Sequence, residues 1–301
     1  MSLYEELCNI LGSAQVLADE PMSRHTTFRV GGPADYFVVP RSTDEIKDTI
    51  ALCKKADVPY YILGNGSNLL VGDKGYRGVV IQIYRNLNEI RTDGNEISAQ
   101  AGALLSKIAA EALSHSLKGF EFASGIPGTL GGAVMMNAGA YGGEMKQVLK
   151  SAVVLTPDGE VKTLSAEELE LGYRTSIVAK KGYIVLEAVL SLDKGDAEAI
   201  RTYMEELREK RVTKQPLEYP SAGSTFKRPE GYFAGKLIED AGLRGFRVGD
   251  AQVSEKHCGF VINRGGATAA EIVSLMEQVA DRVEASAGVR LEPEVKRIGE
   301  F

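Results

Sequence analysis

The sequence has no tryptophan and only three cysteines and three histidines. Cys8, Cys53 and Cys258 are scattered, and none belongs to a Cys-x-x-Cys or Cys/His spacing. This absence excludes a disulfide framework and the common zinc motifs. We therefore expect reduced thiols, as in a cytoplasmic protein, and no bound metal.

Long hydrophobic runs are also missing. No stretch reaches the ~18–20 uninterrupted apolar residues of a membrane span. The start of the chain carries Glu5 and Glu6 instead of the basic region that precedes the apolar core of a signal peptide. The net charge of −6 and the pI of about 5.4 argue against nucleic acid or an anionic membrane as a partner.

What is present is typical of a globular protein. The 301 residues are 44% hydrophobic and 25% charged, and the length suffices for two or three cores. Glycine is unusually frequent, with 33 residues against a usual share of about 7%. Because glycine has no side chain, this enrichment favours loops in which the backbone approaches a ligand.

The most glycine-rich stretch covers residues 125–143 and reads Gly-Ile-Pro-Gly-Thr-Leu-Gly-Gly-Ala-Val-Met-Met-Asn-Ala-Gly-Ala-Tyr-Gly-Gly. Successive backbone N–H groups in such a stretch can bind an anion or line a flat ring. The ordinary interpretation is a tightly packed turn followed by a short buried helix. Glycine content alone does not decide between the two.

A second glycine loop, Gly64-Asn65-Gly66-Ser67-Asn68, lies between two apolar segments within residues 60–71. This order predicts strand, turn and strand, with backbone N–H groups and the Ser67 hydroxyl available to a phosphate. It is neither a Rossmann fingerprint nor a P-loop, because neither G-x-G-x-x-G nor Gly-Lys-Ser/Thr occurs here. Alone it is more often an ordinary turn.

Periodicity and capping signals predict the remaining elements. Ser/Thr–Glu capping boxes at 2/5, 42/45, 165/168 and 268/271 predict helix starts, the last for a helix ending at Gly288. Further helices are predicted over 104–115, 197–212 and 232–240. Strands are predicted over 35–39, 79–83, 89–92, 96–101, 148–155, 160–164, 183–192 and 289–298, and residues 253–263 are expected to hold apolar strand segments.

Six short motifs occur in an order and spacing that are together highly specific. They are His25-Thr26-Thr27-Phe28-Arg29-Val30-Gly31-Gly32-Pro33-Ala34, Leu63-Gly64-Asn65-Gly66-Ser67-Asn68, Gly125-Ile126-Pro127-Gly128, Tyr173-Arg174-Thr175-Ser176, Gly223-Ser224-Thr225-Phe226-Lys227 and Pro293-Glu294-Val295. With these motifs the chain resembles the vanillyl-alcohol-oxidase-like flavoproteins. More narrowly, it resembles the UDP-N-acetylenolpyruvoylglucosamine reductase (MurB) family of peptidoglycan synthesis, over nearly its whole length.

The resemblance implies an α+β fold, with a PCMH-type FAD-binding domain of two α+β subdomains and a C-terminal α+β substrate domain. We place an N-terminal segment at 1–28, the FAD-binding domain at 29–193, the substrate domain at 194–290 and a strand returning to the active site at 291–301. The boundary at 193 rests on Lys194-Gly195-Asp196, which precedes a long charged helix.

The resemblance also implies the activity. The family reduces UDP-N-acetylglucosamine enolpyruvate to UDP-N-acetylmuramate with FAD as cofactor and NADPH as hydride donor. It serves cell-wall biogenesis, and thereby cell shape and division, in the cytoplasm. We expect a monomer that binds neither nucleic acid nor membrane. The choice of NADPH rests on the family alone, because the sequence has no dinucleotide fingerprint.

Cofactor residues follow from the same resemblance. The loop from Gly64 to Asn68 would hold the FAD pyrophosphate, the stretch from 125 to 140 would pass along the flavin, and Arg29 with Gly31 and Gly32 would lie near the adenine. The predicted set is Arg29, Gly31, Gly32, Gly64, Asn65, Gly66, Ser67, Asn68, Gly125, Ile126, Gly128, Thr129, Gly132, Ala133, Asn137, Ala138, Gly139 and Ala140.

Three residues are predicted to be catalytic by resemblance. Ser224 would donate a proton to the substrate carbon, Arg174 would hold the substrate carboxylate, and Glu294 would assist. The ordinary interpretations are a serine bonded to its own backbone and two surface charges. A hydrolase triad is unsupported, because no G-x-S-x-G occurs and no His or Asp is suitably placed.

Substrate contacts are predicted for Tyr173, Lys214, Lys227 and Arg228. The last three belong to a basic cluster in an otherwise acidic chain, which also holds Arg208, Lys210, Arg211 and Lys236. Arg208 and Lys210 are expected on a solvated helix face. Longer relatives carry an inserted tyrosine loop that closes over the substrate pyrophosphate. No such insertion lies between Arg174 and Lys214, so the chain resembles the shorter type, and the group replacing that tyrosine is open.

Two other functions remain open at this point. One is an FAD-linked alcohol oxidase or dehydrogenase on the same scaffold, which leaves Ser224, Glu294 and the Lys214 cluster without a role. The other is a non-catalytic sugar-nucleotide binding protein, which would not require flavin. The histidines His25, His115 and His257 are expected to be structural or peripheral.

Overall fold

The computed structural model describes all residues from 1 to 301, and the chain divides into two compact units. Unit 1 comprises residues 1–16, 38–65 and 80–211, and unit 2 comprises residues 17–37, 66–79 and 212–301. One boundary falls inside the second glycine loop, between Asn65 and Gly66. The predicted domain limits at 28/29, 193/194 and 290/291 stay predictions.

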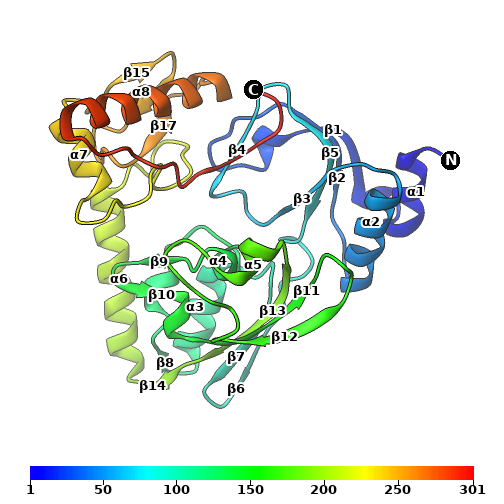
Figure 1. The fold of residues 1–301 in the computed structure, drawn as a ribbon. Coiled ribbons are helices and arrows are strands. Elements are labelled where there is room, and N and C mark those ends of the chain that lie inside the picture. Colours follow the sequence, from blue (N-terminus) through cyan, green and yellow to red (C-terminus); the bar gives the residue numbers. More distant parts are fainter. The chain divides into compact units, whose positions relative to one another are not determined.

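Unit 1 contains a five-stranded antiparallel sheet in the order β12-β11-β13-β7-β6 (Figure 1). Its strands are β6 (Ile90–Asp93), β7 (Glu96–Gln100), β11 (Leu149–Leu155), β12 (Val161–Ser165) and β13 (Ile184–Ser191). Ala188 of β13 lies opposite Ala152 on one side and Ala99 on the other, and all three are buried. Small residues at the centre of the sheet let helices α3 (Leu105–Ser114) and α4 (Leu130–Met135) pack closely against it.

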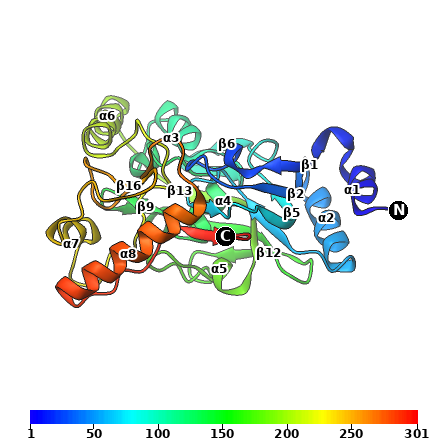
Figure 2. The same cartoon turned by 90° about the horizontal axis from the view of Figure 1, so that it is seen from above.

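The remaining elements of unit 1 are short or lie at its edge. Helices α1 (Leu3–Leu11) and α2 (Thr43–Lys55) lie side by side (Figure 2). The other elements are β3 (Tyr60–Leu63), β8 (Leu117–Lys118), β9 (Gly139–Ala140), β10 (Gly143–Glu144), α5 (Ile177–Lys181), β14 (Asp193–Lys194) and α6 (Ala197–Lys214), whose last residues belong to unit 2.

Unit 2 has its own apolar core, built mainly on α7 (Ala234–Asp240) and α8 (Ala269–Ala287), which pack together (Figure 2). The antiparallel sheet β15-β16-β17 (Arg247–Val248, Ala251–Val253, Val261–Asn263) contributes to this core. Strands β1 (Val16–Pro21), β2 (Pro33–Val38) and β5 (Tyr76–Gln82) are neighbours in that order, and β5 continues into unit 1 beside β3. Strand β4 (Leu69–Val71) pairs in parallel with β18 (Lys296–Ile298).

Local sequence signals predicted several helix ends correctly. The capping boxes of Ser2 with Glu5 and of Thr268 with Glu271 are both complete, and Gly288 ends α8 in the left-handed conformation. The box at Ser42 is half formed: Ser42 accepts from the Glu45 N–H, but the Glu45 carboxylate instead bonds the N–H of Arg41.

Two predictions of local structure were wrong. Ser165 and Glu168 exchange both hydrogen bonds of a capping box, yet only a turn follows, because Glu170 leaves the helical region with φ 45°. The strand predicted over 289–298 is confined to Lys296–Ile298, since its partner β4 is itself only three residues long.

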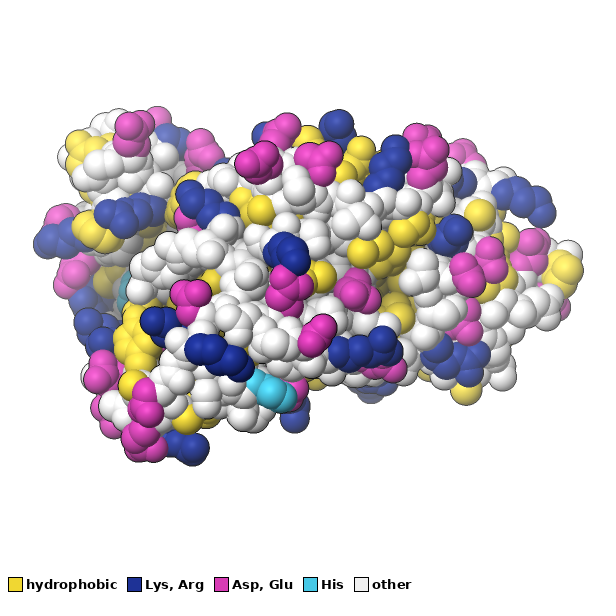
Figure 3. All heavy atoms as spheres, turned by 90° about the horizontal axis from the view of Figure 1, so that it is seen from below, with side chains coloured by type: hydrophobic (Ala, Val, Ile, Leu, Met, Phe, Trp, Pro, Cys, Tyr) yellow, Lys and Arg dark blue, Asp and Glu magenta, His cyan; other side chains and the backbone are white.

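Charges of both signs are interspersed over the face that looks downward in Figure 1, as Figure 3 shows. This agrees with a chain that carries 35 basic and 41 acidic residues. None of the helices combines the length and the apolar character that crossing a membrane requires.

Candidate functional site

The two glycine loops singled out in the sequence meet in unit 1. A Cβ on Gly64 would lie 2.4 Å from the Thr129 hydroxyl oxygen, so only glycine allows this approach. The Asn65 side chain donates a hydrogen bond to the Pro127 carbonyl, with 2.8 Å between the heavy atoms. The loops are separated by some sixty residues of sequence but form one surface.

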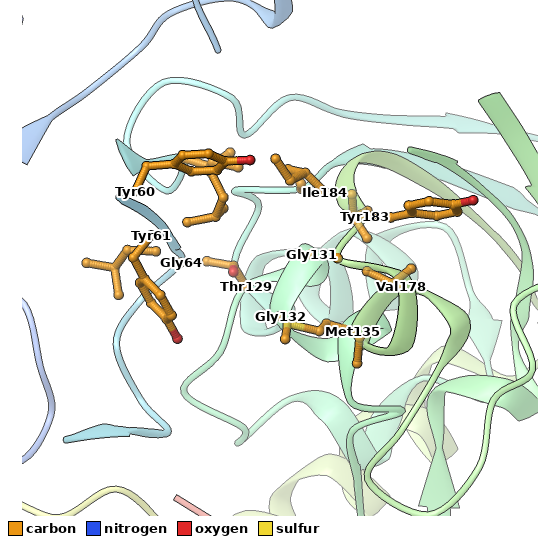
Figure 4. Close-up of a pocket in the computed structure, with 17 residues that line it drawn as sticks. Tyr60, Tyr61, Gly64, Thr129, Gly131, Gly132, Met135, Val178, Tyr183 and Ile184 are labelled. Atoms are coloured by element: carbon orange, nitrogen blue, oxygen red, sulfur yellow. The ribbon is translucent and has the colours of Figure 1, made fainter. Parts of the chain in front are cut away.

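A cavity of about 230 Å³ lies beside this junction (Figure 4). Tyr60 and Tyr61 lie on one side of it and Tyr183 on the other. Gly64, Thr129, Gly131, Gly132 and Met135 line it between these walls, together with Val178 and Ile184. The tyrosine, valine and methionine positions were missed by sequence reasoning, although Tyr60 and Tyr61 directly precede the second glycine loop.

The cavity fits part of a dinucleotide cofactor such as FAD. Its walls are mainly apolar and aromatic, which suits a flat ring system, and the Thr129 hydroxyl offers one polar contact. A Cβ on Gly132 would meet only Thr129, at 3.7 Å, so this glycine leaves space open beside the loop. Pockets that enclose a whole drug-sized ligand hold about 300–1,000 Å³, so this cavity would take one portion of FAD.

The other half of the second glycine loop belongs to unit 2. Gly66 has φ 64°, and a Cβ there would lie 2.0 Å from the His25 carbonyl oxygen. The backbone carbonyl of Asn68 accepts from the Lys296 N–H, and its side chain donates to the Glu294 carbonyl at 3.2 Å. Packing therefore requires a glycine at position 66, independently of its predicted contact with FAD.

In unit 2 the backbone at Arg29, Gly31 and Gly32 passes very close to a second segment of the chain. Arg29 adopts φ 56° and Gly31 φ 126°. A Cβ on Gly32 would lie 2.2 Å from the Asp73 carbonyl oxygen. These contacts give the two glycines a packing role, and their place near the adenine stays a prediction.

The stretch from 125 to 143 contains the short helix α4, as its ordinary interpretation requires, and then a small hairpin. Gly139 pairs with Glu144 across this hairpin. A Cβ on Gly143 would lie within 2.4 Å of the Phe122 ring. The buried side chain of Asn137 makes three hydrogen bonds within the protein. Its backbone N–H also bonds the Val134 carbonyl, so the predicted cofactor contact would fall to its carbonyl oxygens.

Arg174 lies in a two-residue turn of unit 1. Gly172 and Thr175 exchange backbone hydrogen bonds of 3.1 and 3.3 Å across it, and Arg174 has φ 54°. The Arg174 guanidinium lies over the Tyr173 ring at 5.2 Å from its centroid, and Tyr173 is 53% exposed. The turn thus presents an arginine and a tyrosine together, as the resemblance requires.

Ser224 and Glu294 lie on neighbouring segments of unit 2. The N–H of Glu294 donates to the carbonyl of Thr225, the residue after Ser224, at 2.8 Å. Ser224 itself is exposed and follows Gly223, which has φ 74°. Thr225 is buried, and its side-chain oxygen accepts from the Val261 N–H at 2.8 Å. The fold therefore brings together two predicted catalytic residues that are seventy positions apart in sequence.

Several members of the predicted basic cluster have partners within unit 2. Lys227 pairs with Glu292 at 3.0 Å, and Lys236 pairs with Asp240 at 2.5 Å. Arg228 bonds the Tyr232 carbonyl and lies 3.9 Å from the Phe233 ring centroid. Arg208 and Lys210 are exposed on α6, as expected.

Lys214 lies at the end of α6, near the ring of His257. Burial of that ring lowers the pKa of His257, and the charges of Arg244 and Lys214 lower it further. The His257 Nδ1 atom accepts from the Gly259 N–H at 3.1 Å. Since Lys214 is exposed, its charge remains available to an anionic ligand.

Arg211 is a residue of this region whose place the sequence did not predict. Its side chain lies against Gly125, where a Cβ would be only 2.7 Å from the Arg211 Nε atom. The guanidinium is 6.0 Å from the Tyr141 ring centroid, and burial lowers its pKa. A positive charge is therefore held against the start of the longest glycine stretch.

Comparison with known proteins defines the class of the chain first. Residues 34–165 match the family model of the FAD binding domain. The 4-ethylphenol oxidase of Gulosibacter chungangensis superposes with a TM-score of 0.51 and 15% identity, over 97% of this chain and 64% of that one. These matches confirm the predicted fold class and FAD as the cofactor.

The family follows from closer relatives. Residues 215–298 match the model of the UDP-N-acetylenolpyruvoylglucosamine reductase C-terminal domain. The reductase of that name from Agathobacter rectalis is 59% identical over 298 residues, covering 95% of both chains. The one from Alkaliphilus oremlandii is 55% identical and covers 100% of this chain and 99% of its own.

A solved structure agrees with these relatives. The UDP-N-acetylenolpyruvylglucosamine reductase of Thermus caldophilus has a TM-score of 0.80 and 36% identity, over 94% of this chain and 98% of its own. The chain belongs to the UDP-N-acetylenolpyruvoylglucosamine reductase family, which confirms the predicted FAD-containing oxidoreductase. It is of the shorter type: between Arg174 and Lys214 the elements α5, β13, β14 and α6 follow one another with only short connections.

Proposed function

We propose that the chain reduces UDP-N-acetylglucosamine enolpyruvate to UDP-N-acetylmuramate, with NADPH as the electron source. A hydride is added to C3 of the enolpyruvyl group and a proton to C2, and NADPH becomes NADP⁺. The product serves peptidoglycan synthesis. The observation that carries this proposal is 59% identity to a reductase of this name along almost the whole chain. An alcohol oxidase or a sugar-nucleotide binding protein would leave that identity unexplained.

We propose that the joined glycine loops of unit 1 hold FAD. One portion of FAD fits the cavity between the tyrosines, and the pyrophosphate would lie at the backbone N–H groups near Gly64 and Asn65. The bound flavin supplies the ability to accept a hydride from NADPH and to deliver one to the substrate. The chain's own part is to bind, orient and protonate the substrate.

Each proposed catalytic residue has a task that suits its chemistry. The Arg174 guanidinium matches the two oxygens of the substrate carboxylate, into which negative charge spreads as C3 accepts hydride. Ser224 donates the proton to C2, and the exposure of this side chain lets it reach a ligand. Glu294, bonded beside Ser224 through Thr225, donates a hydrogen bond when protonated. Preorganised groups of this kind are typically worth ~10²–10³ in rate.

The UDP part of the substrate carries two phosphates and requires positive charge. We propose Lys214 for the pyrophosphate, because it is exposed at the end of α6. The tyrosine loop of longer relatives is absent, and we propose His257 in its place because the charge of Lys214 acts on the His257 ring. Lys227, Arg228 and Tyr173 are proposed as further substrate contacts.

We also propose that the protein acts as a monomer in the cytoplasm, away from membrane and nucleic acid. Both the UDP-sugar and NADPH are metabolites of the cytoplasm, and the three cysteines are free. The net charge of −6 agrees with partners that are small molecules rather than nucleic acid.

The role of Ser224 separates the two halves of the reaction. No substrate carbon needs a proton while NADPH reduces the enzyme, so Ser224→Ala should lose its flavin absorbance normally under anaerobic conditions. Reoxidation by the enolpyruvyl substrate should slow by ~10²–10⁴-fold, the usual loss for a positioned acid. Stopped-flow absorbance measures both steps. Equal slowing of both would assign Ser224 to the fold, and no slowing would move the proton donor to Glu294.

A further inference from the structure

Asn137 is buried but its side chain is fully hydrogen-bonded. It is 1% exposed and has φ 44°, a left-handed conformation that asparagine tolerates better than most residues. Its side-chain oxygen accepts from the Lys146 N–H at 2.9 Å. Its amide nitrogen donates to the Glu144 carboxylate at 2.9 Å and to the Gly172 carbonyl at 3.1 Å.

The bond to Gly172 joins two segments that the sequence keeps apart. Gly172 is the first residue of the turn that presents Tyr173 and Arg174, and it bonds Thr175 across that turn. Asn137 lies two residues after α4, the helix whose glycines border the proposed FAD cavity. The amide therefore connects the glycine-rich stretch to the base of the arginine turn.

A second contact anchors the other end of the turn. Ser176 is fully buried, and its hydroxyl donates to the carbonyl of Met135, the last residue of α4, at 2.6 Å. The same oxygen accepts from the Ala179 N–H and caps α5. Both ends of the segment from Gly172 to Ser176 are thus bonded to the end of one short helix.

These anchors compensate for an unfavourable backbone. Arg174 has φ 54°, a conformation that costs energy for any residue with a Cβ. Such a residue keeps its conformation only where its surroundings over-determine it, and this is typical of functional sites. The Asn137 amide is bonded at both its oxygen and its nitrogen, which fixes its orientation.

We propose that Asn137 is a positioning residue for Arg174: its amide holds the Gly172 carbonyl and thereby sets where the guanidinium meets the substrate carboxylate. This inference rests on the role proposed above for Arg174. Asn137 would then act in substrate reduction without touching the substrate. It would act alongside the contact to FAD predicted for the same residue, and the two roles have different signatures.

The test compares Asn137→Asp with Arg174→Ala and the double variant, all as FAD-loaded protein. Aspartate keeps the shape and the acceptor for Lys146 but removes both donors and places a carboxylate against Glu144. We expect reoxidation by the enolpyruvyl substrate to slow by ~10–10²-fold, because small displacements of a positioned group have effects of this size. Reduction by NADPH, which carries no such carboxylate, should be unchanged.

Two controls keep the result interpretable. Lys146→Ala removes only the exposed ion pair on the same hairpin, leaves the bonds of Asn137 intact and should behave like the parent protein. Asn137→Gly suits the positive φ and removes every side-chain bond, so it replaces Asn137→Asp if that variant does not fold. Hydrogen exchange of the Thr175 amide, which bonds Gly172, should rise in either Asn137 variant, with or without substrate.

The double variant decides the mechanism. If Asn137 acts through Arg174, adding Asn137→Asp to Arg174→Ala slows reoxidation no further. Independent, multiplying effects would overturn the proposal while leaving Arg174 in its role, as would unchanged reoxidation in Asn137→Asp. Loss of bound flavin or slow reduction by NADPH would instead assign Asn137 to FAD binding alone. If Arg174→Ala itself reoxidised normally, the role of Arg174 and this inference would both fail.

Discussion

The turn that carries Arg174 and the segment that carries Glu294 are held in place by different kinds of hydrogen bond. Each is bonded by the side chain of an asparagine from a glycine-rich stretch, Asn137 in unit 1 and Asn68 in unit 2. Around Arg174 the remaining anchor is another side chain, Ser176. Around Glu294 the remaining anchors are backbone groups, namely the bond to Thr225 and the parallel pairing of β18 with β4.

The difference determines how each residue tolerates mutation. Side-chain bonds disappear with one substitution, whereas main-chain bonds survive every substitution except those that remove an N–H. We therefore expect the position of Arg174 to be sensitive to conservative changes near it, and the position of Glu294 to resist them. Three variants test this contrast from the side of unit 2.

The largest effect is expected for Lys296→Pro. The Lys296 N–H donates to the Asn68 carbonyl at 3.0 Å at the start of β18, and proline has no N–H to give. Glu294, two residues earlier, loses its register, so kcat should fall by ~10²-fold. Lys296→Ala keeps the backbone donor at this exposed position and should retain kcat in steady-state assays. Equal rates for the two variants would refute the main-chain explanation.

A smaller effect, on stability and not on rate, is expected for Thr225→Val. The variant keeps the shape of a fully buried side chain but leaves the Val261 N–H without its acceptor. Such a loss costs ~1–3 kcal/mol, which urea denaturation can measure. Because the Thr225 carbonyl still accepts from Glu294, kcat should stay close to that of the parent protein. A fall in kcat as large as that of Asn137→Asp would remove the contrast between the two regions.

The smallest expected effect is on the loss of stability at low pH, which involves His257. Burial lowers the pKa of His257, so the folded protein favours the neutral ring, whose Nδ1 accepts from Gly259; the Gly259 carbonyl in turn accepts from Thr225. The resulting stability is complete above the unfolded pKa of about 6.5 and is lost as pH falls below it toward the lowered folded value.

His257→Gln should remove that dependence. Thermal midpoints measured from about pH 8 to about pH 5 should fall more steeply for the parent than for the variant. The corresponding difference in the free energy of unfolding is at most ~1.4 kcal/mol for each unit by which folding lowers the pKa of His257. Parallel curves would show that folding does not lower the pKa of His257.

Local chemistry explains which parts of the fold the sequence predicted. Capping boxes at Ser2 and Thr268 and the glycine at 288 specify helix ends through neighbours three residues away, and all three were correct. The box at Ser165 formed its hydrogen bonds without a helix, because a cap satisfies only the first turn and Glu170 departs from helical geometry. The C-terminal strand was overpredicted because its length depends on β4, a partner some 227 residues away.

The sequence singled out those residues of the candidate site that belong to glycine motifs. The sequence could single out Gly64 and Thr129, but not that they touch. Tyr183 and Val178 line the cavity from segments with no motif, and their signal is ordinary apolar composition. Asn137 was assigned to the cofactor by resemblance, and nothing local reveals that its amide also bonds a carbonyl thirty-five residues away.

The pairing of early and late segments in unit 2 has a consequence for synthesis on the ribosome. Asp73 accepts hydrogen bonds from Ala269 and Ala270 at the start of α8, and β4 pairs only with β18. These partners are translated about 200 residues later, an interval on the order of ten seconds or more at ~5–20 residues per second. Unit 1 has all its residues once Arg211 has emerged. Until residue 298 follows, the nascent chain displays the unpaired edge of β4, a surface that a chaperone would have to cover.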